Sequence, residues 1–252
     1  MAVLEAKNVT MRFGGLTAVD DFNLTLNSNE LVGLIGPNGA GKTTIFNTLT
    51  GVYVPTEGEI NIGGASIVGK HSHEVVQMGA ARTFQNIRLF KDLTTIENVE
   101  IAYHNFIHYN MLQGLFRLPK FWQEEKKAYT ECKKLLEIFD MGEYEQTKAR
   151  NLPYGQQRKL EIARALASDP KVLMLDEPAA GMNPNETEEL MKTIHFIRNK
   201  FDITVLLIEH DMNLVMGICE RIIVVDYGKT IAEGTPDEIK NNPEVIRAYL
   251  GD

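Results

Sequence analysis

Residues 36–43, Gly-Pro-Asn-Gly-Ala-Gly-Lys-Thr, fit the pattern G-x-x-x-x-G-K-[S/T] at every position. An apolar stretch at residues 31–35 precedes this octet, and a segment that favours a helix, residues 42–50, follows it. Glycines let backbone N–H groups turn inward around a phosphate, and the N-terminus of the following helix adds partial positive charge. This strand–loop–helix order predicts an α/β fold with a site for the phosphates of a nucleotide.

Each position of the octet has an expected contact. Lys42 would reach the β- and γ-phosphates as a point charge, and the hydroxyl of Thr43 is the expected Mg²⁺ ligand. The other nucleotide-binding candidates are the remaining loop residues and the residue after the octet: Gly36, Pro37, Asn38, Gly39, Ala40, Gly41 and Thr44.

A second apolar stretch, residues 172–175, ends in the adjacent carboxylates of Asp176 and Glu177. Because neighbouring side chains of a strand alternate in direction, the two carboxylates can have different tasks. Asp176 would hold Mg²⁺, directly or through water, and Glu177 would polarise the attacking water. These two elements alone leave a kinase, a GTPase and a helicase-type ATPase open.

Hydrophobic patterns divide the chain into regions. Strand and helix patterns alternate from residue 171 onward, which predicts a parallel sheet, whereas residues 86–167 have a helical pattern. No linker rich in proline, glycine and serine separates the regions. We therefore predict one domain, residues 1–252, in which a helical subdomain of about residues 86–167 is inserted into a nucleotide-binding body, residues 1–85 and 168–252.

Charge and composition exclude several classes of protein. With 26 basic and 34 acidic side chains the net charge is 26 − 34 = −8, which argues against a nucleic-acid partner. No apolar run approaches the roughly 18 residues of a membrane-spanning helix, and the N-terminus lacks the pattern of a secretory signal. These features predict a cytoplasmic chain, with Cys132 and Cys219 as buried thiols rather than a disulfide.

Residues 152–157, Leu-Pro-Tyr-Gly-Gln-Gln, directly precede a helix-prone segment and resemble the LSGGQ signature of ABC ATPases. The other motifs of that family occur in the same order and spacing: Gln85 matches the Q-loop, His210 the switch histidine, Phe13 the aromatic side chain that stacks on adenine, and residues 180–183 the D-loop. The resemblance covers nearly the whole chain. It is strongest to the LivG-type ATPases of branched-chain amino acid importers, whose signature is similar to Leu-Pro-Tyr-Gly-Gln-Gln-Arg.

The resemblance implies a P-loop NTPase of the ABC type, with a mixed-sheet core, an antiparallel β subdomain and an inserted α-helical subdomain. It implies ATP and Mg²⁺ as ligands. The catalytic residues would be Glu177, His210 and Gln85, and the metal would lie among Thr43, Gln85 and Asp176.

The resemblance also implies partners. Two ATPase subunits would form a head-to-tail dimer, in which Gly155 and Gln156 of one subunit contact the ATP on the phosphate loop of the other. The second subunit would be an identical chain or a sister ATPase. Integral membrane permease subunits would hold the dimer at the cytoplasmic side of the cell membrane.

Three positions depart from the family pattern. Pro153 has neither the hydroxyl nor the N–H of the usual serine, and Tyr154 replaces the next glycine, so the expected contact rests on Gly155 and Gln156. Asn183 replaces the usual D-loop aspartate and can still form hydrogen bonds.

Several functions stay open from the sequence. They are an ABC ATPase for another cargo, such as urea or an exported lipid, a soluble ABC ATPase without a membrane partner, and a regulatory module without turnover. Intact Lys42, Asp176 and Glu177 argue against the last of these. The aromatic-rich residues 103–122 are compatible with core packing or with a docking surface for a membrane partner.

Overall fold

The computed structural model describes residues 2–250, which form two compact units. One unit contains the chain up to Gln85 and again from Pro170, and the other contains Asn86–Asp169. The phosphate loop and the adjacent carboxylates therefore belong to the first unit, and residues 152–157 belong to the second.

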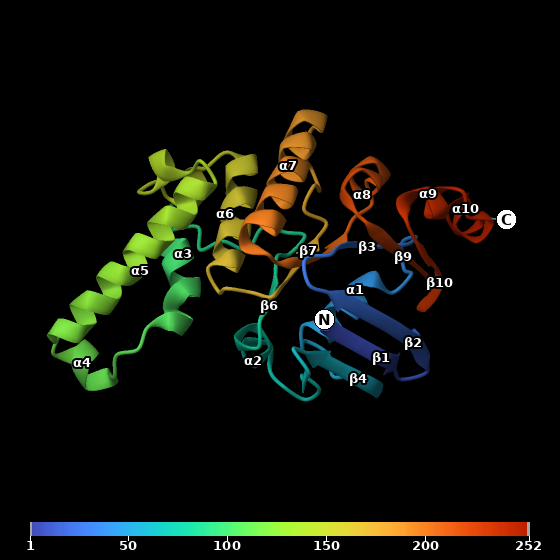
Figure 1. Cartoon of the computed structure of the whole chain (residues 1–252), viewed down its shortest axis with the longest axis horizontal. Coiled ribbons are helices and arrows are strands. Elements are labelled where there is room, and N and C mark those ends of the chain that lie inside the picture. The colour runs from blue at the N-terminus through green and yellow to red at the C-terminus, as the bar shows by residue number, and fades with distance from the viewer. Residues whose placement is uncertain (1, 251–252) are drawn as a thin grey trace. The chain divides into compact units, whose positions relative to one another are not determined.

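The first unit is built on two sheets (Figure 1). One is antiparallel, with the strand order β2-β1-β4-β5. The other has the order β10-β9-β3-β8-β7-β6, and only the β10–β9 pair in it is antiparallel. The strands are β1 (Ala2–Phe13), β2 (Leu16–Asn27), β3 (Leu31–Ile35), β4 (Glu57–Ile62), β5 (Ala65–Ser66), β6 (Ala80–Arg82), β7 (Val172–Asp176), β8 (Thr204–Ile208), β9 (Arg221–Asp226) and β10 (Lys229–Gly234). The α/β class with a mixed sheet and an antiparallel sheet is confirmed.

The three central strands explain where the functional residues meet. Every residue of β3, β7 and β8 is buried, as expected for strands covered on both faces. The three strands are parallel neighbours in the order β3-β8-β7. Their carboxyl ends therefore lie at one edge of the sheet, so the segments that follow them are brought together there.

Helices in the first unit follow these strands along the chain (Figure 1). They are α1 (Lys42–Leu49), α2 (Ser72–Gln77), α7 (Pro184–Phe201), α8 (Met212–Ile218), α9 (Pro236–Lys240) and α10 (Pro243–Leu250). Asn183 is the N-cap of α7, since its side chain accepts from the N–H groups of Asn185 and Glu186. Asn183, which replaces the usual D-loop aspartate, thus stabilises the start of α7.

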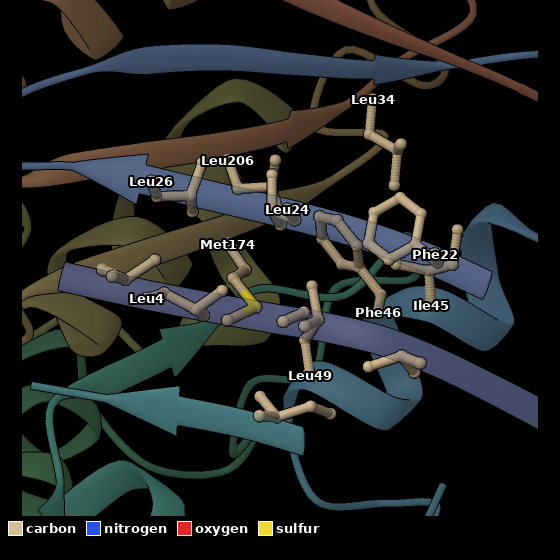
Figure 2. Close-up of a cluster of buried hydrophobic side chains, with 14 of the residues drawn as sticks. Leu4, Phe22, Leu24, Leu26, Leu34, Ile45, Phe46, Leu49, Met174 and Leu206 are labelled. Atoms are coloured by element: carbon tan, nitrogen blue, oxygen red, sulfur yellow. The ribbon is translucent and has the colours of Figure 1, made fainter. Parts of the chain in front are cut away.

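A continuous apolar core lies between the antiparallel sheet, the buried face of α1 and the six-stranded sheet. Figure 2 shows Leu24 and Leu26 on β2, Phe46 and Leu49 on α1, and Met174 on β7 within this cluster. All five are at most 3% exposed. This packing fixes the start of α1, and with it the phosphate loop, against both sheets.

The second unit is helical (Figure 1). Its elements are α3 (Thr95–Tyr103), η1 (His104–Phe106), α4 (Met111–Leu115), α5 (Pro119–Ile138), η2 (Gly142–Tyr144), η3 (Ala149–Asn151) and α6 (Tyr154–Leu166). Helix α3 packs against both α5 and α6. Inside the unit, Arg158 and Glu161 of α6 form a fully buried ion pair with an N–O distance of 2.7 Å.

Two further predictions concern the chain as a whole. Both cysteines are buried free thiols, which confirms that prediction, and burial raises the pKa of Cys132 and of Cys219 to about 12. Among the residues that the structure describes, no helix has the length and apolar character needed to cross a bilayer.

Candidate active site

The phosphate loop joins the end of β3 to the start of α1, and its shape depends on two glycines. Gly36 has φ +153°, and a Cβ there would lie 2.0 Å from the carbonyl oxygen of Val225. Gly41 has φ +103°, and a Cβ there would lie 2.6 Å from the carbonyl oxygen of Ala18. Because no other residue fits these two approaches, the glycines of the motif are required by backbone packing as well as by access to phosphate.

Lys42 is the first residue of α1 and is only 6% exposed. Its ammonium group donates to the carbonyl oxygens of Gly36 at 2.7 Å and Pro37 at 2.8 Å. Burial lowers the pKa of Lys42, and the nearby negative charge of Glu177 partly opposes that effect. The Lys42 side chain thus lies against its own loop, where a phosphate oxygen could replace either carbonyl oxygen as the hydrogen-bond acceptor.

The three predicted catalytic residues are in contact, because Gln85 and His210 both bind the carboxylate of Glu177. Glu177 lies directly after β7, where Gln85 Nε2 donates to its Oε2 at 2.5 Å and His210 Nε2 lies 2.6 Å from its Oε1. These residues come from segments after β6, β7 and β8. The backbone of Glu177 has φ +45°, an uncommon conformation for a residue with a side chain, which indicates that its position is imposed by the surrounding structure.

Asp176 has a partner that the sequence did not suggest. Its Oδ2 accepts from Arg82 Nη2 at 2.5 Å, and both side chains are under 10% exposed. Arg82 also donates to Asn47 Oδ1 of α1 at 2.7 Å and lies 5.1 Å from the ring centroid of Phe84. This arginine therefore links the helix of the phosphate loop, the aspartate of β7 and the segment that leads to Gln85.

Replacing Arg82 by alanine should lower the free energy of unfolding by about 3–5 kcal/mol, because a buried Asp176 carboxylate would lose its cation. Arg150→Ala is the matched control, since Arg150 forms a similar arginine–aspartate pair with Asp92, at 2.7 Å, but on the surface, with both side chains more than half exposed. That control should cost about 0–1 kcal/mol. Urea unfolding measures both values, and equal losses would contradict the assigned role of Arg82.

Glu209 is the second residue that the sequence did not single out. It is 3% exposed, and its Oε1 accepts from the N–H of Ala179 at 2.7 Å while its Oε2 accepts from the N–H of His210 at 3.0 Å. One carboxylate thus ties the segment after Glu177 to the segment that carries His210. Burial raises the pKa of Glu209, and its backbone hydrogen bonds partly oppose the effect.

The raised pKa gives a pH-dependent prediction for Glu209. The folded protein binds this proton more tightly than the unfolded chain, so the contribution of Glu209 to stability is present below its ordinary pKa of 4.5 and declines as pH rises above it. The unfolding free energy of wild type minus that of Glu209→Gln should therefore fall as pH rises, which urea titrations at a series of pH values would measure. Glu97→Gln should give the opposite slope, because hydrogen bonds from Thr94 lower the pKa of Glu97. Slopes of the same sign would contradict this assignment.

Most of the remaining predicted residues of the first unit lie at exposed or half-exposed positions. Phe13 ends β1 with 42% exposure, and its ring stands edge-on to Tyr53 with centroids 5.3 Å apart. Thr43 is exposed in the first turn of α1, and Thr44 beside it is half-buried. Pro37, Asn38 and Gly39 form the outer part of the loop, whereas Ala40 is buried.

Gly155 and Gln156 lie in the other unit, in the first turn of α6. Pro153 is the N-cap residue of this helix and supplies no side-chain cap. The helix itself has no carbonyl acceptors for the N–H groups of Gly155 and Gln156, so these groups can face an anion.

The side-chain oxygen atoms of the predicted metal ligands are of the kind that Mg²⁺ prefers. An aspartate, a hydroxyl from Thr43 and the side-chain carbonyl of Gln85 are hard oxygen ligands, and Mg²⁺ in nucleotide sites takes one or two carboxylates together with phosphates and water. The side-chain nitrogen of Gln85 donates to Glu177, and its side-chain carbonyl oxygen is the atom of a type that Mg²⁺ binds. Within the described residues no group of three or more His, Cys, Asp or Glu side chains forms a denser metal site.

A glycine loop between a buried strand and a helix, with a carboxylate pair at the end of a neighbouring parallel strand, defines a P-loop nucleotide hydrolase. Residues 19–180 match the family model of the ABC transporter, and residues 229–252 match the model of the branched-chain amino acid ATP-binding cassette transporter. The chain belongs to the ABC transporter family of ATP-binding proteins and is an ATPase of that family.

Individual relatives agree with this assignment. The chain is 49% identical to the high-affinity branched-chain amino acid transport ATP-binding protein BraF of Pseudomonas aeruginosa and to LivG of Escherichia coli K12, in each case over 99% of this chain and 98% of the relative. The ADP conformation of the ATP-binding cassette MJ1267 matches at 30% identity with a TM-score of 0.86, over all of both chains. A dimeric post-hydrolysis state of the cassette MJ0796 bound to ADP and Pi matches at 26% identity with a TM-score of 0.77, over 92% of this chain and 98% of that one.

Proposed function

We propose that this chain is the ATP-hydrolysing subunit of a membrane importer for branched-chain amino acids. The observation that supports turnover is the convergence of Gln85 and His210 on the Glu177 carboxylate, within 2.5 and 2.6 Å. The cargo is supported by the 49% identity to BraF and LivG and by the match of the C-terminal segment. Urea import and lipid export remain the alternatives for cargo.

In the proposed reaction, Lys42 and the loop N–H groups hold the phosphates, and the exposed ring of Phe13 stacks on the base. Bound Mg²⁺, held by Thr43, Asp176 and Gln85, would neutralise charge on the phosphates. Glu177 accepts a proton from water as the water oxygen bonds to the γ-phosphorus and the bond from that phosphorus to the β–γ bridging oxygen breaks.

His210 and Gln85 have positioning roles in this scheme. His210 Nε2 holds one oxygen of Glu177 while Gln85 Nε2 holds the other, so the orientation of the base depends on both contacts. Glu209 keeps the backbone before His210 fixed to the segment after Glu177. A shift of the segment that carries Gln85 would therefore change the orientation of the Glu177 carboxylate.

We further propose that two subunits close head to tail around ATP, with Gly155 and Gln156 of one subunit facing the γ-phosphate held by the other. Support comes from the first turn of α6, whose N–H groups can bind an anion, and from the dimeric MJ0796 cassette. Permease subunits would hold the pair at the cytoplasmic side of the membrane, and closure would shift a conformational equilibrium in them.

Reconstitution with candidate permease subunits from the same organism tests the proposal. Proteoliposomes that hold the assembly and a matching binding protein should take up labelled leucine when ATP is supplied. The same proteoliposomes should not take up labelled urea. Uptake of urea instead would overturn the cargo. ATP hydrolysis by the isolated chain, without capture of any of those membrane proteins, would favour an ABC ATPase without a membrane partner.

A further inference from the structure

The second unit carries large apolar side chains at the N-terminal end of its long helix α5, where α4 precedes it (Figure 1). We call this surface the α4 tip; it consists of Met111, Leu112, Leu115, Phe116, Leu118 and Trp122, which are between 44% and 88% exposed. A cluster of six such side chains within twelve residues is larger than the single exposed apolar residues that soluble surfaces normally carry. The cluster therefore indicates a surface that contacts something apolar.

The α4 tip has a fixed conformation rather than a frayed one. Asn110 and Gln113 form a reciprocal capping box at the start of α4, with distances of 3.0 and 2.9 Å. The ring of Phe121 packs edge-on against Tyr109, whose hydroxyl donates to Glu125 at 2.8 Å. One side of the segment is thus held to α5, and the apolar side chains of the α4 tip are presented on an ordered scaffold.

Charge distinguishes this segment from the rest of the chain. Residues 101–123 contain no aspartate or glutamate, whereas the whole chain has a net charge of −8. Arg117 and Lys120 are both exposed within it, and the Arg117 guanidinium lies 6.0 Å from the ring centroid of Trp122. The α4 tip therefore combines apolar and aromatic side chains with two positive charges, and the nearest carboxylates in the sequence are Glu100 before it and Glu124 after it.

This combination matches the boundary between lipid headgroups and acyl chains. Tryptophan and phenylalanine with leucine enter that boundary, while nearby arginine and lysine pair with anionic headgroups. An apolar groove of a protein partner would be satisfied by the hydrophobic side chains alone and would not require 23 residues free of acidic side chains.

We propose that the α4 tip is a membrane-contact surface, which inserts its apolar side chains into the headgroup boundary of an anionic bilayer and pairs Arg117 and Lys120 with lipid phosphates. The proposal goes beyond ATP hydrolysis and does not depend on the cargo. It gives the ATPase a direct lipid contact in addition to any contact through permease subunits, and it assigns a partner to the aromatic-rich segment that the active site does not use.

Trp122 provides a direct test because it is the only tryptophan of the chain. The purified full chain is mixed with vesicles of phosphatidylcholine alone or of phosphatidylcholine with phosphatidylglycerol. With phosphatidylglycerol present, the tryptophan emission should shift to shorter wavelength, and the protein should co-sediment with the vesicles. Higher salt should weaken both effects, because exposed charges are screened.

Matched variants separate the two contributions. Phe116→Ser should remove most of the emission shift seen with phosphatidylglycerol. Arg117→Gln combined with Lys120→Gln should reduce binding to the level seen with phosphatidylcholine alone and remove its dependence on salt. Phe196→Ser, which changes a 47% exposed aromatic side chain on α7 of the other unit, should leave vesicle binding unchanged. All of these positions are exposed and lie outside the proposed catalytic residues, so basal ATPase activity should persist and report an intact fold.

Three results would overturn the proposal. The first is wild-type protein that neither sediments with phosphatidylglycerol vesicles nor changes its emission. The second is α4-tip variants that bind these vesicles as well as wild type. The third is an emission change that appears only with permease subunits in detergent and never with protein-free vesicles, which would make the α4 tip a protein-docking surface.

Discussion

Glu177→Gln should lower kcat for ATP hydrolysis by about 10²–10⁴-fold, the usual contribution of a positioned general base. The amide keeps the size of the side chain but cannot take the proton of the attacking water. It also places a donor where Glu177 now accepts from Gln85 and contacts His210. Single-turnover and steady-state phosphate release measure the loss directly.

The same substitution should leave ATP bound, because Lys42 and the phosphate loop are unchanged. With hydrolysis slowed, the ATP-bound closed dimer should accumulate, and light scattering after size exclusion in MgATP would detect it. Glu189→Gln replaces an exposed glutamate of α7 and serves as the control, with turnover like that of wild type. Near wild-type turnover in Glu177→Gln would refute the role of this residue.

The parts of the site that could be predicted from sequence are those whose chemistry is local. The octet at residues 36–43 predicts a tight phosphate loop, and the structure shows that Gly36 and Gly41 occupy positions where a Cβ would collide with backbone. The fully buried strands β7 and β8 were visible as short apolar runs. Parallel order then followed from the alternation of strands with helices.

Arg82 and Glu209 could not be predicted because their partners are remote or are backbone groups. Arg82 pairs with Asp176 across 94 positions, and nothing near either residue marks the pair. Glu209 accepts from backbone N–H groups, one of them 30 positions away, and such donors have no sequence signature. Both contacts exist only after the sheet has placed the ends of β6, β7 and β8 side by side.

Asn183 shows how one residue can fit two interpretations. The resemblance matched it to the D-loop, whereas the structure makes it the cap of α7, in a reciprocal box with Glu186. The spacing of the two residues carries that capping signal in the sequence itself. The side-chain oxygen of Asn183 accepts hydrogen bonds at the start of α7, so this cap fixes the position from which Asn183 could contact a partner subunit.

Lys42→Ala should weaken ATP binding by about 30-fold or more, because removal of one partner from a buried charged contact costs about 2–5 kcal/mol and 1.4 kcal/mol corresponds to tenfold. Isothermal titration with MgATP measures the change. ADP should lose less affinity than ATP, since the expected contact reaches the β- and γ-phosphates and ADP presents only the first of them. Lys126→Ala, at an exposed position of α5, should bind both nucleotides like wild type.

Loop distortion is the competing explanation for such a loss, because Lys42 also holds the carbonyl groups of Gly36 and Pro37. Lys42→Arg separates the two causes: it retains a positive charge and donors for those carbonyls, but its larger planar group suits the compact phosphate contact less well. If Lys42→Arg binds ATP far better than Lys42→Ala, charge at this position governs affinity. Unchanged ATP affinity in Lys42→Ala would instead show that Lys42 does not contribute to nucleotide binding, which would contradict the role assigned to it in the phosphate loop.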